Sequence, residues 1–289
     1  MPNKIFKILK EAQEERWAVG QFNISNLETL RGIVQAGQNL KSPLIIGTSE
    51  GESAFIGLRQ VSILVESLRE ETRLPIFLNL DHGKTFEYIK EAIEAGYEMV
   101  HFDGSKLPLA KNIEITKRIV EFCQKKGVSV EGEVGFIPGA SQVLESAPEI
   151  KEADLTNPDD ALKFVRETKV DRLAINIGTF HGIESSGLNP PINLLRLKEI
   201  KEKVGDKAFL VLHGGSGTPE EDLKQAVKSG IVKININTDL RLAFTDALKK
   251  SLKQNPKESA PYKYLSQAVE AVQRVVENKI RLFGSVNKI

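Results

Sequence analysis

From about residue 17 onward, short β-rich runs alternate with longer amphipathic segments along this chain. Such an alternation is typical of a parallel sheet in which each strand is followed by a helix that covers it. We predict eight strands from these runs. They are Ala18–Asn23, Pro43–Thr48, Pro75–Leu80, Met99–Asp103, Val128–Val134, Arg172–Ile177, Ala208–Leu212 and Val232–Asn235.

Helical patterns lie between these strands, and several are followed by glycine in the position that ends a helix. They include Leu27–Asn39, Thr85–Ala95, Leu109–Lys126, Pro158–Thr168, Leu194–Lys203 and Glu220–Ser229. Eight strand–helix units in about 250 residues match the size of a closed (β/α)8 TIM barrel, so we predict this α/β fold. An open doubly wound sheet is the alternative. Its ligand site lies at one switch point, whereas polar groups follow at least five strands here.

The sequence pattern of the remaining residues does not indicate a second domain. The tail from Pro261 to Ile289 has the pattern of one additional C-terminal helix, Tyr264–Leu282, without a linker or a core of its own. We therefore expect residues 1–289 to form a single barrel domain that includes the helical extension 261–289.

Composition excludes several classes of partner. The 289 residues carry 40 Lys and Arg against 39 Asp and Glu, with no long block of one sign. A nucleic-acid or anionic-membrane binder would need a basic footprint, so we expect small molecules or copies of this chain as partners. No apolar stretch has the length of a signal peptide or a membrane span, which predicts a soluble, cytoplasmic protein. Cys123 falls in a helical pattern and is interpreted as a buried small hydrophobe rather than a nucleophile.

Histidine is the residue type that points most directly to function. Three of the four histidines, His82, His181 and His213, follow predicted strands and are expected at the catalytic end of the barrel. Three imidazole ligands with an open fourth position describe a catalytic zinc site. Each histidine alone is as well explained by a local hydrogen bond, but three strand ends together favour the metal. His101 is interpreted as a packed strand residue.

Carboxylates accompany the histidines. Asp81 directly precedes His82 and is a candidate general acid or base, or else an orienting partner for a ligand histidine. Asp103 ends another predicted strand, and Glu131 and Glu133 are spaced by two, so both point to one face of their strand. Salt bridges inside a barrel explain these last three residues about as well as catalysis does.

Two polar loops predict a phosphate site. His213–Gly217 contains three glycines that leave backbone N–H groups free to surround an anion, ahead of a helix. Asn235–Asp239 adds amide and hydroxyl donors at the exit of the last strand. The loops after the seventh and eighth strands are where such barrels frequently bind phosphate.

With these residues placed, the chain resembles the zinc-dependent class II fructose-bisphosphate and tagatose-bisphosphate aldolases over essentially its whole length. The resemblance lies in motifs distributed along the sequence. They are Gln21–Glu28, Asp81–Glu87, Asp103–Ser105, Val130–Gly135, Ile177–Gly182, Leu212–Gly217, Lys233–Arg241 and Lys279–Ser285.

The resemblance implies a set of site residues and an assembly. It implies His82, His181 and His213 as ligands of one Zn²⁺ and Asp81 as the proton-transfer residue, with Glu133 a glutamate near the metal. Asp103 and Glu131 are candidates for supporting roles behind these ligands. A monovalent cation, Na⁺ or K⁺, and a homodimer or homotetramer are also implied. The dihydroxyacetone phosphate moiety is expected against Gly182, Gly214, Gly215, Ser216, Asn235, Ile236, Asn237 and Thr238.

The sequence departs from the family pattern at two places. Relatives usually carry an acidic loop after the position of Gly135, whereas residues 136–147 here offer only Glu145, in a register that does not match. The second proton-transfer group is therefore unassigned. Tyr262 stands where many members use an arginine, lent by a neighbouring subunit, for the far phosphate, and tyrosine cannot replace a cationic fork. Either another cation such as Lys263 or Arg281 binds that phosphate, or the natural aldehyde product is not glyceraldehyde 3-phosphate.

Fructose 1,6-bisphosphate is the expected substrate of this lyase. Tagatose 1,6-bisphosphate or another ketose phosphate, such as a phosphorylated deoxy-keto-gluconate, is the alternative within the superfamily. The alternative from a different functional class is a non-catalytic barrel that stabilises a true aldolase as a partner subunit. It is disfavoured because Asp81 and the three histidines are all present.

Overall fold

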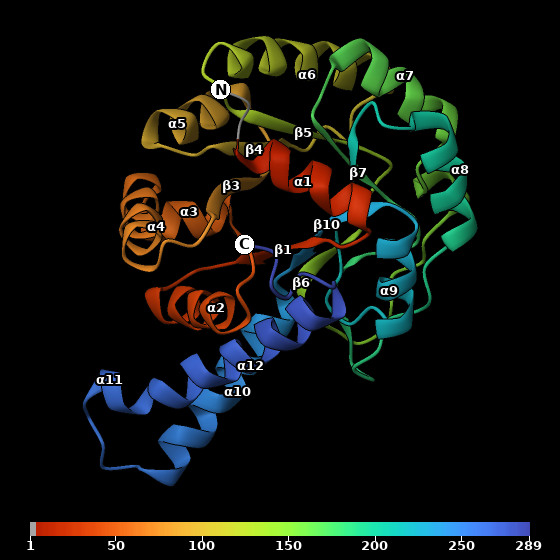
Figure 1. The fold of residues 1–289 in the computed structure, drawn as a ribbon. Coiled ribbons are helices and arrows are strands. Elements are labelled where there is room, and N and C mark those ends of the chain that lie inside the picture. Colours follow the sequence, from red (N-terminus) through yellow and green to blue (C-terminus); the bar gives the residue numbers. More distant parts are fainter. Residues whose placement is uncertain (1–3) are drawn as a thin grey trace.

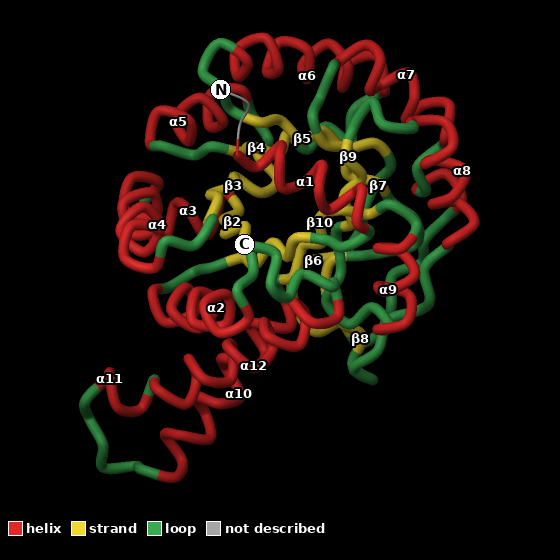
Figure 2. Tube along the Cα trace, viewed as in Figure 1, coloured by secondary structure: helices red, strands yellow, loops and turns green. Residues whose placement is uncertain are grey.

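The computed structural model describes residues 4–289. Its centre is a closed barrel of eight parallel strands in the order β1-β10-β9-β7-β5-β4-β3-β2, seen in Figures 1 and 2. The predicted (β/α)8 fold is confirmed. The barrel strands are β1 (Val19–Asn23), β2 (Leu44–Ser49), β3 (Ile76–Gly83), β4 (Met99–Phe102), β5 (Ser129–Val134), β7 (Arg172–Ile175), β9 (Phe209–Leu212) and β10 (Ile231–Ile236).

Helices surround the barrel (Figure 2). Six of them, α2 (Leu27–Leu40), α5 (Phe86–Ala95), α6 (Leu109–Gln124), α7 (Pro158–Thr168), α8 (Leu194–Val204) and α9 (Glu220–Lys228), lie within two residues of their predicted bounds. Side-chain caps fix several starts: Asn26, Thr85 and Asn157 each accept a backbone N–H of the first turn. Four helices were not singled out by the sequence patterns. They are α1 (Lys4–Glu15), α3 (Glu50–Ile56), α4 (Leu58–Thr72) and α10 (Thr238–Gln254).

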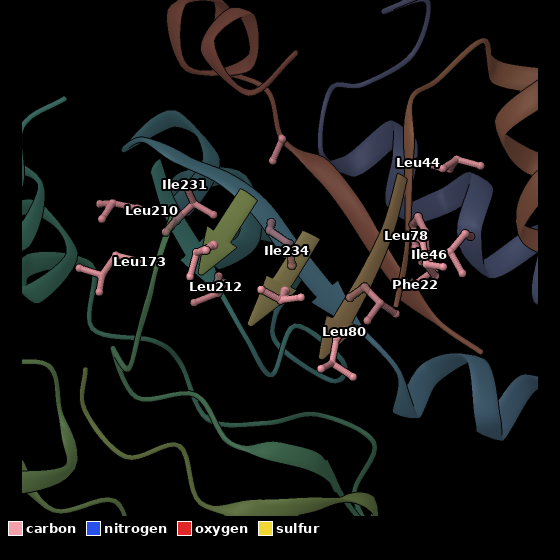
Figure 3. Close-up of a cluster of buried hydrophobic side chains, with 14 of the residues drawn as sticks. Phe22, Leu44, Ile46, Leu78, Leu80, Leu173, Leu210, Leu212, Ile231 and Ile234 are labelled. Carbon is pink, nitrogen blue, oxygen red and sulfur yellow. The ribbon is translucent and has the colours of Figure 1, made fainter. Parts of the chain in front are cut away.

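The main hydrophobic core lies between the barrel wall and the helices (Figure 3). It is built from alternate strand residues, for example Leu78 and Leu80 of β3 and Leu210 and Leu212 of β9, which are almost completely buried. Because successive strand side chains point to opposite faces, the residues between them point into the barrel. This alternation decides which side chains can form the site.

A smaller core closes the N-terminal end of the barrel. The helix α1 crosses that end (Figure 1) and places Ile5 and Leu9 against the first inward-facing residues of the strands, such as Val19, Phe77 and Phe209. Farther along the strands the barrel interior becomes polar, with Glu131, Arg172 and Lys233 all fully buried. The apolar plug therefore lies at one end and the ionisable groups lie toward the other.

The C-terminal region differs from the single predicted helix. It forms α11 (Pro261–Tyr264) and α12 (Ser266–Leu282), separated by Leu265, which keeps right-handed helical dihedral angles. The predicted helix Tyr264–Leu282 is found as α12, which begins two residues later and ends at the predicted residue, whereas the short helix α11 before it was not predicted. The long helices α10 and α12 pack together, and with α11 they form an arm that projects from the barrel (Figure 1).

A second, two-stranded parallel sheet pairs β6 (Gly139–Leu144) with β8 (His181–Glu184). No sequence pattern predicted it, because β6 is largely exposed and lacks the apolar alternation of a buried strand. Within residues 4–289, no helix combines the length and apolar character needed to cross a bilayer.

Close packing of α2 against α12 gives a test of the fold. A Cβ on Gly32 would lie 2.7 Å from the carbonyl oxygen of Val269, whereas a Cβ on Gly51 would meet nothing within 4 Å. We expect Gly32→Ala to lower the free energy of unfolding by about 1–3 kcal/mol through overpacking. The matched variant Gly51→Ala, also in a helix, is expected to be neutral or to stabilise by up to about 1 kcal/mol. Urea denaturation of both variants measures this, and equal midpoints would contradict the packing of α12.

Candidate active site

Strand alternation points a group of ionisable side chains into the C-terminal half of the barrel. In β3, Leu80 packs outward in the main core and Asp81 therefore points inward. In the same way β4 presents His101, and β5 presents Glu131 and Glu133. His101 and Glu131 are register partners on neighbouring strands, so their side chains lie on the same inner face.

His82 and His213 face each other across a short gap. The Nε2 of His82 lies 3.0 Å from the Nδ1 of His213. The outer nitrogen of each ring contacts a carboxylate, with His82 Nδ1 2.9 Å from Asp103 and His213 Nε2 2.8 Å from Glu131. Each histidine is therefore oriented from behind by an acid, which is the usual arrangement for imidazoles that bind a metal.

Both orienting carboxylates are held in their ionised form. Burial opposes the ionisation of Asp103, but the hydrogen bond and charge of His82, together with His101 and Ser105, outweigh it and lower the pKa of this carboxyl. Burial also opposes ionisation of Glu131, but the charge of Lys233 and the contact with His213 keep its pKa well below its ordinary value. Ionised carboxylates accept the N–H of the outer nitrogens, so neutral rings turn their unprotonated nitrogens toward each other.

Two facing lone pairs repel unless a proton or a metal ion lies between them. Two nitrogen ligands of a tetrahedral zinc ion, each ~2.0–2.1 Å from the metal, lie roughly 3.4 Å apart. The 3.0 Å separation of the facing nitrogens is close to this value. Asp81, His82, His101 and His213 bring one donor atom each to within 4.8 Å of one another. This donor set fits a divalent transition-metal ion.

His181 lies beside this group but enters from outside the barrel. It is the first residue of β8, and its ring centroid lies 4.7 Å from that of His82 and 6.1 Å from that of His213. Burial and the neighbouring charges of His82 and His213 keep its pKa well below the ordinary value. His181 therefore remains neutral, which is the form that binds metals.

Asp81 is positioned by two side-chain amides. Asn23 Nδ2 donates to its Oδ2 (2.9 Å), and Asn235 Nδ2 donates to its Oδ1 (3.0 Å). Burial is the largest single influence and raises the pKa of Asp81, but His82, His101, His213 and Lys233 together outweigh it and hold this pKa well below its ordinary value. The carboxylate is thus available as a proton acceptor at the edge of the metal cluster.

Glu131 and Glu133 have different surroundings. Glu131 accepts from Arg172 (2.9 Å) and from Lys233 (2.9 Å) in addition to His213. Glu133 is equally buried, but its Oε2 has no hydrogen bond and lies 3.3 Å from Nε2 of His101 and 3.9 Å from Nδ1 of His82. Glu131 is therefore fixed in a buried ionic group, whereas the Oε2 of Glu133 contacts the rings of His101 and His82.

Glycine loops form the opposite wall. Gly182 and Gly214 have φ values of 118° and 68°, which favour glycine, and a Cβ on Gly214 would lie 2.4 Å from the carbonyl oxygen of Phe180. Ser216 Oγ accepts the backbone N–H groups of Asn237 and Asp239 at the start of α10 (3.2 Å each). These loops surround a pocket of about 450 Å³ that also contains Asp81 and His82.

Comparisons with known proteins identify the family of this chain. The family described as fructose-bisphosphate aldolase class-II matches residues 3–288. The chain belongs to the class II fructose-bisphosphate aldolase family. It is similar to a fructose-bisphosphate aldolase of Thermus caldophilus, with 39% identity over 303 aligned residues that cover 98% of each chain. It is therefore an aldolase, a lyase of carbohydrate metabolism, and members of this family are metal-dependent.

Solved structures share the fold. The YdjI aldolase of Escherichia coli K12 is 30% identical with a TM-score of 0.82, and 99% of this chain and 98% of that chain are covered. A putative fructose-1,6-bisphosphate aldolase of Coccidioides immitis is 25% identical with a TM-score of 0.83, covering 98% and 97%. A fructose-bisphosphate aldolase of Campylobacter jejuni reaches a TM-score of 0.85 at 22% identity, covering 99% and 95%, and supports the fold alone.

The structure of this aldolase brings most of the predicted residues together. The rings of His82, His181 and His213 are neighbours, and Asp81 and Asp103 lie beside them. Among the predicted phosphate-site residues, Gly215 and Ile236 do not line the pocket, because Ile236 belongs to the main core and Gly215 packs against β10. The others do: Gly182, Gly214, Ser216, Asn235, Asn237 and Thr238.

Two buried side chains were missed by the sequence interpretation. His101, taken as a packed strand residue, is indeed buried in β4, but its Nδ1 accepts the backbone N–H of His82 (3.2 Å). This bond helps to hold His82 at a φ of 53°, a left-handed conformation that is rare outside glycine. Glu52 accepts from Asn23, Asn237 and Arg241. The inward register of His101 was a usable signal, whereas nothing local indicated Glu52.

The cations at the pocket also differ from expectation. Lys84, Lys106 and Arg241 line it. Lys263 lies in α11 on the arm, where it pairs with Glu258 at 3.0 Å, and neither it nor Arg281 lines the pocket of its own chain. Glu145 is exposed just after β6 and likewise does not line the pocket.

Removing the orienting carboxylate behind His82 tests the metal centre. Asp103→Asn preserves shape but weakens the hold on the Nδ1–H tautomer of His82. We expect the affinity for Zn²⁺ to fall by about 10- to 100-fold. Competition titration against a chromophoric chelator measures it. Asp206→Asn, which removes a surface carboxylate paired with Lys201, serves as the control. Unchanged affinity in Asp103→Asn would contradict the orienting role.

Proposed function

We propose that this protein is a zinc-dependent class II aldolase that reversibly cleaves fructose 1,6-bisphosphate to dihydroxyacetone phosphate and glyceraldehyde 3-phosphate. The observation that carries the proposal is the pair of histidine nitrogens of His82 and His213, 3.0 Å apart, with buried Asp81 beside them. The family membership and the sugar-phosphate chemistry of aldolases support it.

His82, His181 and His213 are the proposed zinc ligands. His82 and His213 are oriented by carboxylates. Burial lowers the pKa of His181 and of His213, which favours the neutral form that binds a metal. Zn²⁺ bound there supplies a Lewis acid that stabilises the negative charge developing on the three-carbon half of the substrate. His101 supports the backbone of His82. Glu133, whose Oε2 contacts the rings of His101 and His82, is retained as a second catalytic candidate.

Asp81 performs the proton transfer of the proposed reaction. Its carboxylate accepts the proton of the C4 hydroxyl while the C3–C4 bond breaks, C4 becomes the aldehyde carbonyl, and the electron pair of the broken bond remains on the C3 side. Uptake of one proton at C3 then gives dihydroxyacetone phosphate. Condensation reverses these steps. The amides of Asn23 and Asn235 hold the two carboxylate oxygens, which fixes the direction of the remaining lone pairs toward the pocket.

The phosphate of the three-carbon half is proposed to bind the glycine loops. Gly182, Gly214, Ser216 and the start of α10 surround this end of the pocket, where backbone N–H groups and a helix N-terminus favour an anion. We also propose that a Na⁺ or K⁺ ion binds beside this phosphate. The proposal further includes a homodimer or homotetramer, a cytoplasmic location and one continuous domain over residues 1–289.

Other ketose phosphates remain secondary candidates. Tagatose 1,6-bisphosphate differs from the fructose compound only in configuration at C4, where Asp81 acts in the proposal. The relative from Thermus caldophilus is named a fructose-bisphosphate aldolase, which favours the fructose epimer. A non-catalytic role is disfavoured because His82 and His213 lie with buried Asp81 in a group of donor atoms that could hold a metal ion.

Substitution of the base tests the assignment. Asp81→Asn retains the size of the side chain but removes the proton acceptor. We expect the kcat for cleavage of fructose 1,6-bisphosphate to fall by about 10²–10⁴-fold. Zinc content, measured by elemental analysis, is expected to remain at one ion per subunit. Near-normal cleavage with zinc bound would disprove the role of Asp81.

Metal removal tests the cofactor. Dialysis against a chelator is expected to abolish cleavage of fructose 1,6-bisphosphate, and addition of Zn²⁺ is expected to restore it, because His82, His181 and His213 alone provide no Lewis acid. Circular dichroism before and after dialysis controls for unfolding. A metal-free protein that cleaves the sugar at the original rate would refute the zinc mechanism.

A further inference from the structure

The two ends of the active-site pocket have different chemistry. The proposed phosphate loops follow β9 and β10, whereas Lys84 follows β3 and Lys106 follows β4. Around the ring, the pair β9 and β10 is separated from the pair β3 and β4 by two strands on each side. Lys84 and Lys106 therefore lie diametrically across the barrel mouth from the phosphate loops.

A ketose bisphosphate carries one phosphate at each end. If one phosphate binds the loops after β9 and β10, the C3–C4 bond lies centrally, near Asp81 and the histidines. The second phosphate then lies on the side of the mouth that β3 and β4 form. This is the side on which Lys84 and Lys106 line the pocket.

Both lysines have charge available for a ligand. Within residues 4–289, neither ammonium group takes part in an ion pair or a hydrogen bond. The third cation at the pocket, Arg241, is paired with Glu52 at 2.6 Å and also donates to the carbonyl oxygen of Ser141 (3.0 Å). The positive charge of Arg241 is therefore already compensated by Glu52. Arg241 lies in the first turn of α10, which follows β10 on the other side of the mouth.

The two lysines are also partly fixed in place. The Nζ of Lys106 lies 5.3 Å from the centre of the Phe136 ring, a cation–π contact that keeps its side chain at the pocket wall. The backbone N–H of Lys84 donates to Glu50 Oε1 (2.8 Å), which anchors the loop after β3. Tyr262 and Lys263 lie on the projecting arm and do not line the pocket of their own chain.

We propose that Lys84 and Lys106 form the subsite for the phosphate on the aldehyde half of the substrate and so select bisphosphorylated ketoses. Two ammonium groups offer several N–H donors and two positive charges to a phosphate dianion. The inference rests on the proposed function, because it takes the scissile bond to lie at the metal cluster. It adds the residues that recognise the far end of the substrate.

The test compares substrates with and without the second phosphate. Lys84→Met, Lys106→Met and the double variant are assayed with fructose 1,6-bisphosphate and with fructose 1-phosphate, at constant ionic strength. Charge-assisted hydrogen bonds are worth about 1.5–3 kcal/mol, so each single variant is expected to lose about tenfold or more in kcat/KM for the bisphosphate. The value for fructose 1-phosphate is expected to change less than twofold. Zinc content reports whether the neighbouring metal centre is intact.

Matched variants separate this subsite from general charge effects. Lys90→Met removes a surface lysine of α5 that pairs with Glu94 and does not line the pocket, and it is expected to leave both substrates unaffected. Lys263→Met tests whether a cation on the projecting arm, rather than Lys84 and Lys106, binds the distal phosphate. Selective loss of bisphosphate cleavage in Lys263→Met, but not in the Lys84 and Lys106 variants, would overturn the proposal.

The remaining outcomes distinguish the inference from the function on which it rests. If the unaltered enzyme cleaves both sugars with equal efficiency, no distal phosphate site operates and the inference fails while the aldolase function stands. Equal losses for both sugars in the double variant also refute selectivity. If the zinc-loaded enzyme cleaves neither sugar, the proposed substrate itself is wrong.

Discussion

The site depends on two imidazole nitrogens held 3.0 Å apart with their lone pairs facing each other. Neutral rings at that distance repel, so the arrangement is stable only when a cation occupies the gap or a proton is shared across it. Asp103 and Glu131 impose it from behind by accepting the outer N–H of His82 and His213. These two contacts fix the orientation of both rings.

The same constraint explains the charges inside the barrel. A carboxylate placed behind His213 must be buried, and an isolated buried charge costs several kcal/mol. Glu131 is compensated by Arg172 on β7 and Lys233 on β10, both fully buried. The interior is consequently polar where the histidines lie, and the apolar residues that plug the barrel are confined to the N-terminal end under α1. The buried charges that support the histidines therefore also determine which part of the barrel interior can be filled with apolar side chains.

The local sequence pattern was sufficient to predict the helices and strands that bury one regular face. The eight barrel strands and the six main helices follow from periodicity and capping residues such as Asn26 and Thr85. The pattern did not predict β6, because the residues of this strand are largely exposed and show no apolar alternation. His101 shows an intermediate case. Its strand was predicted, but its bond to the backbone of His82 depends on a register that only the folded sheet defines.

Local sequence was enough to predict the barrel and to single out His82, His181, His213, Asp81 and the glycine loops as candidates, because strand periodicity and residue chemistry depend on neighbouring residues. The tertiary structure alone decided which nitrogen of each histidine faces its neighbour, that Glu52 ties Asn23 to Arg241, and that Lys84 and Lys106 lie opposite the phosphate loops. These relations join residues far apart in the chain. Their geometry is set by ring closure of the sheet, which no local segment of the sequence encodes.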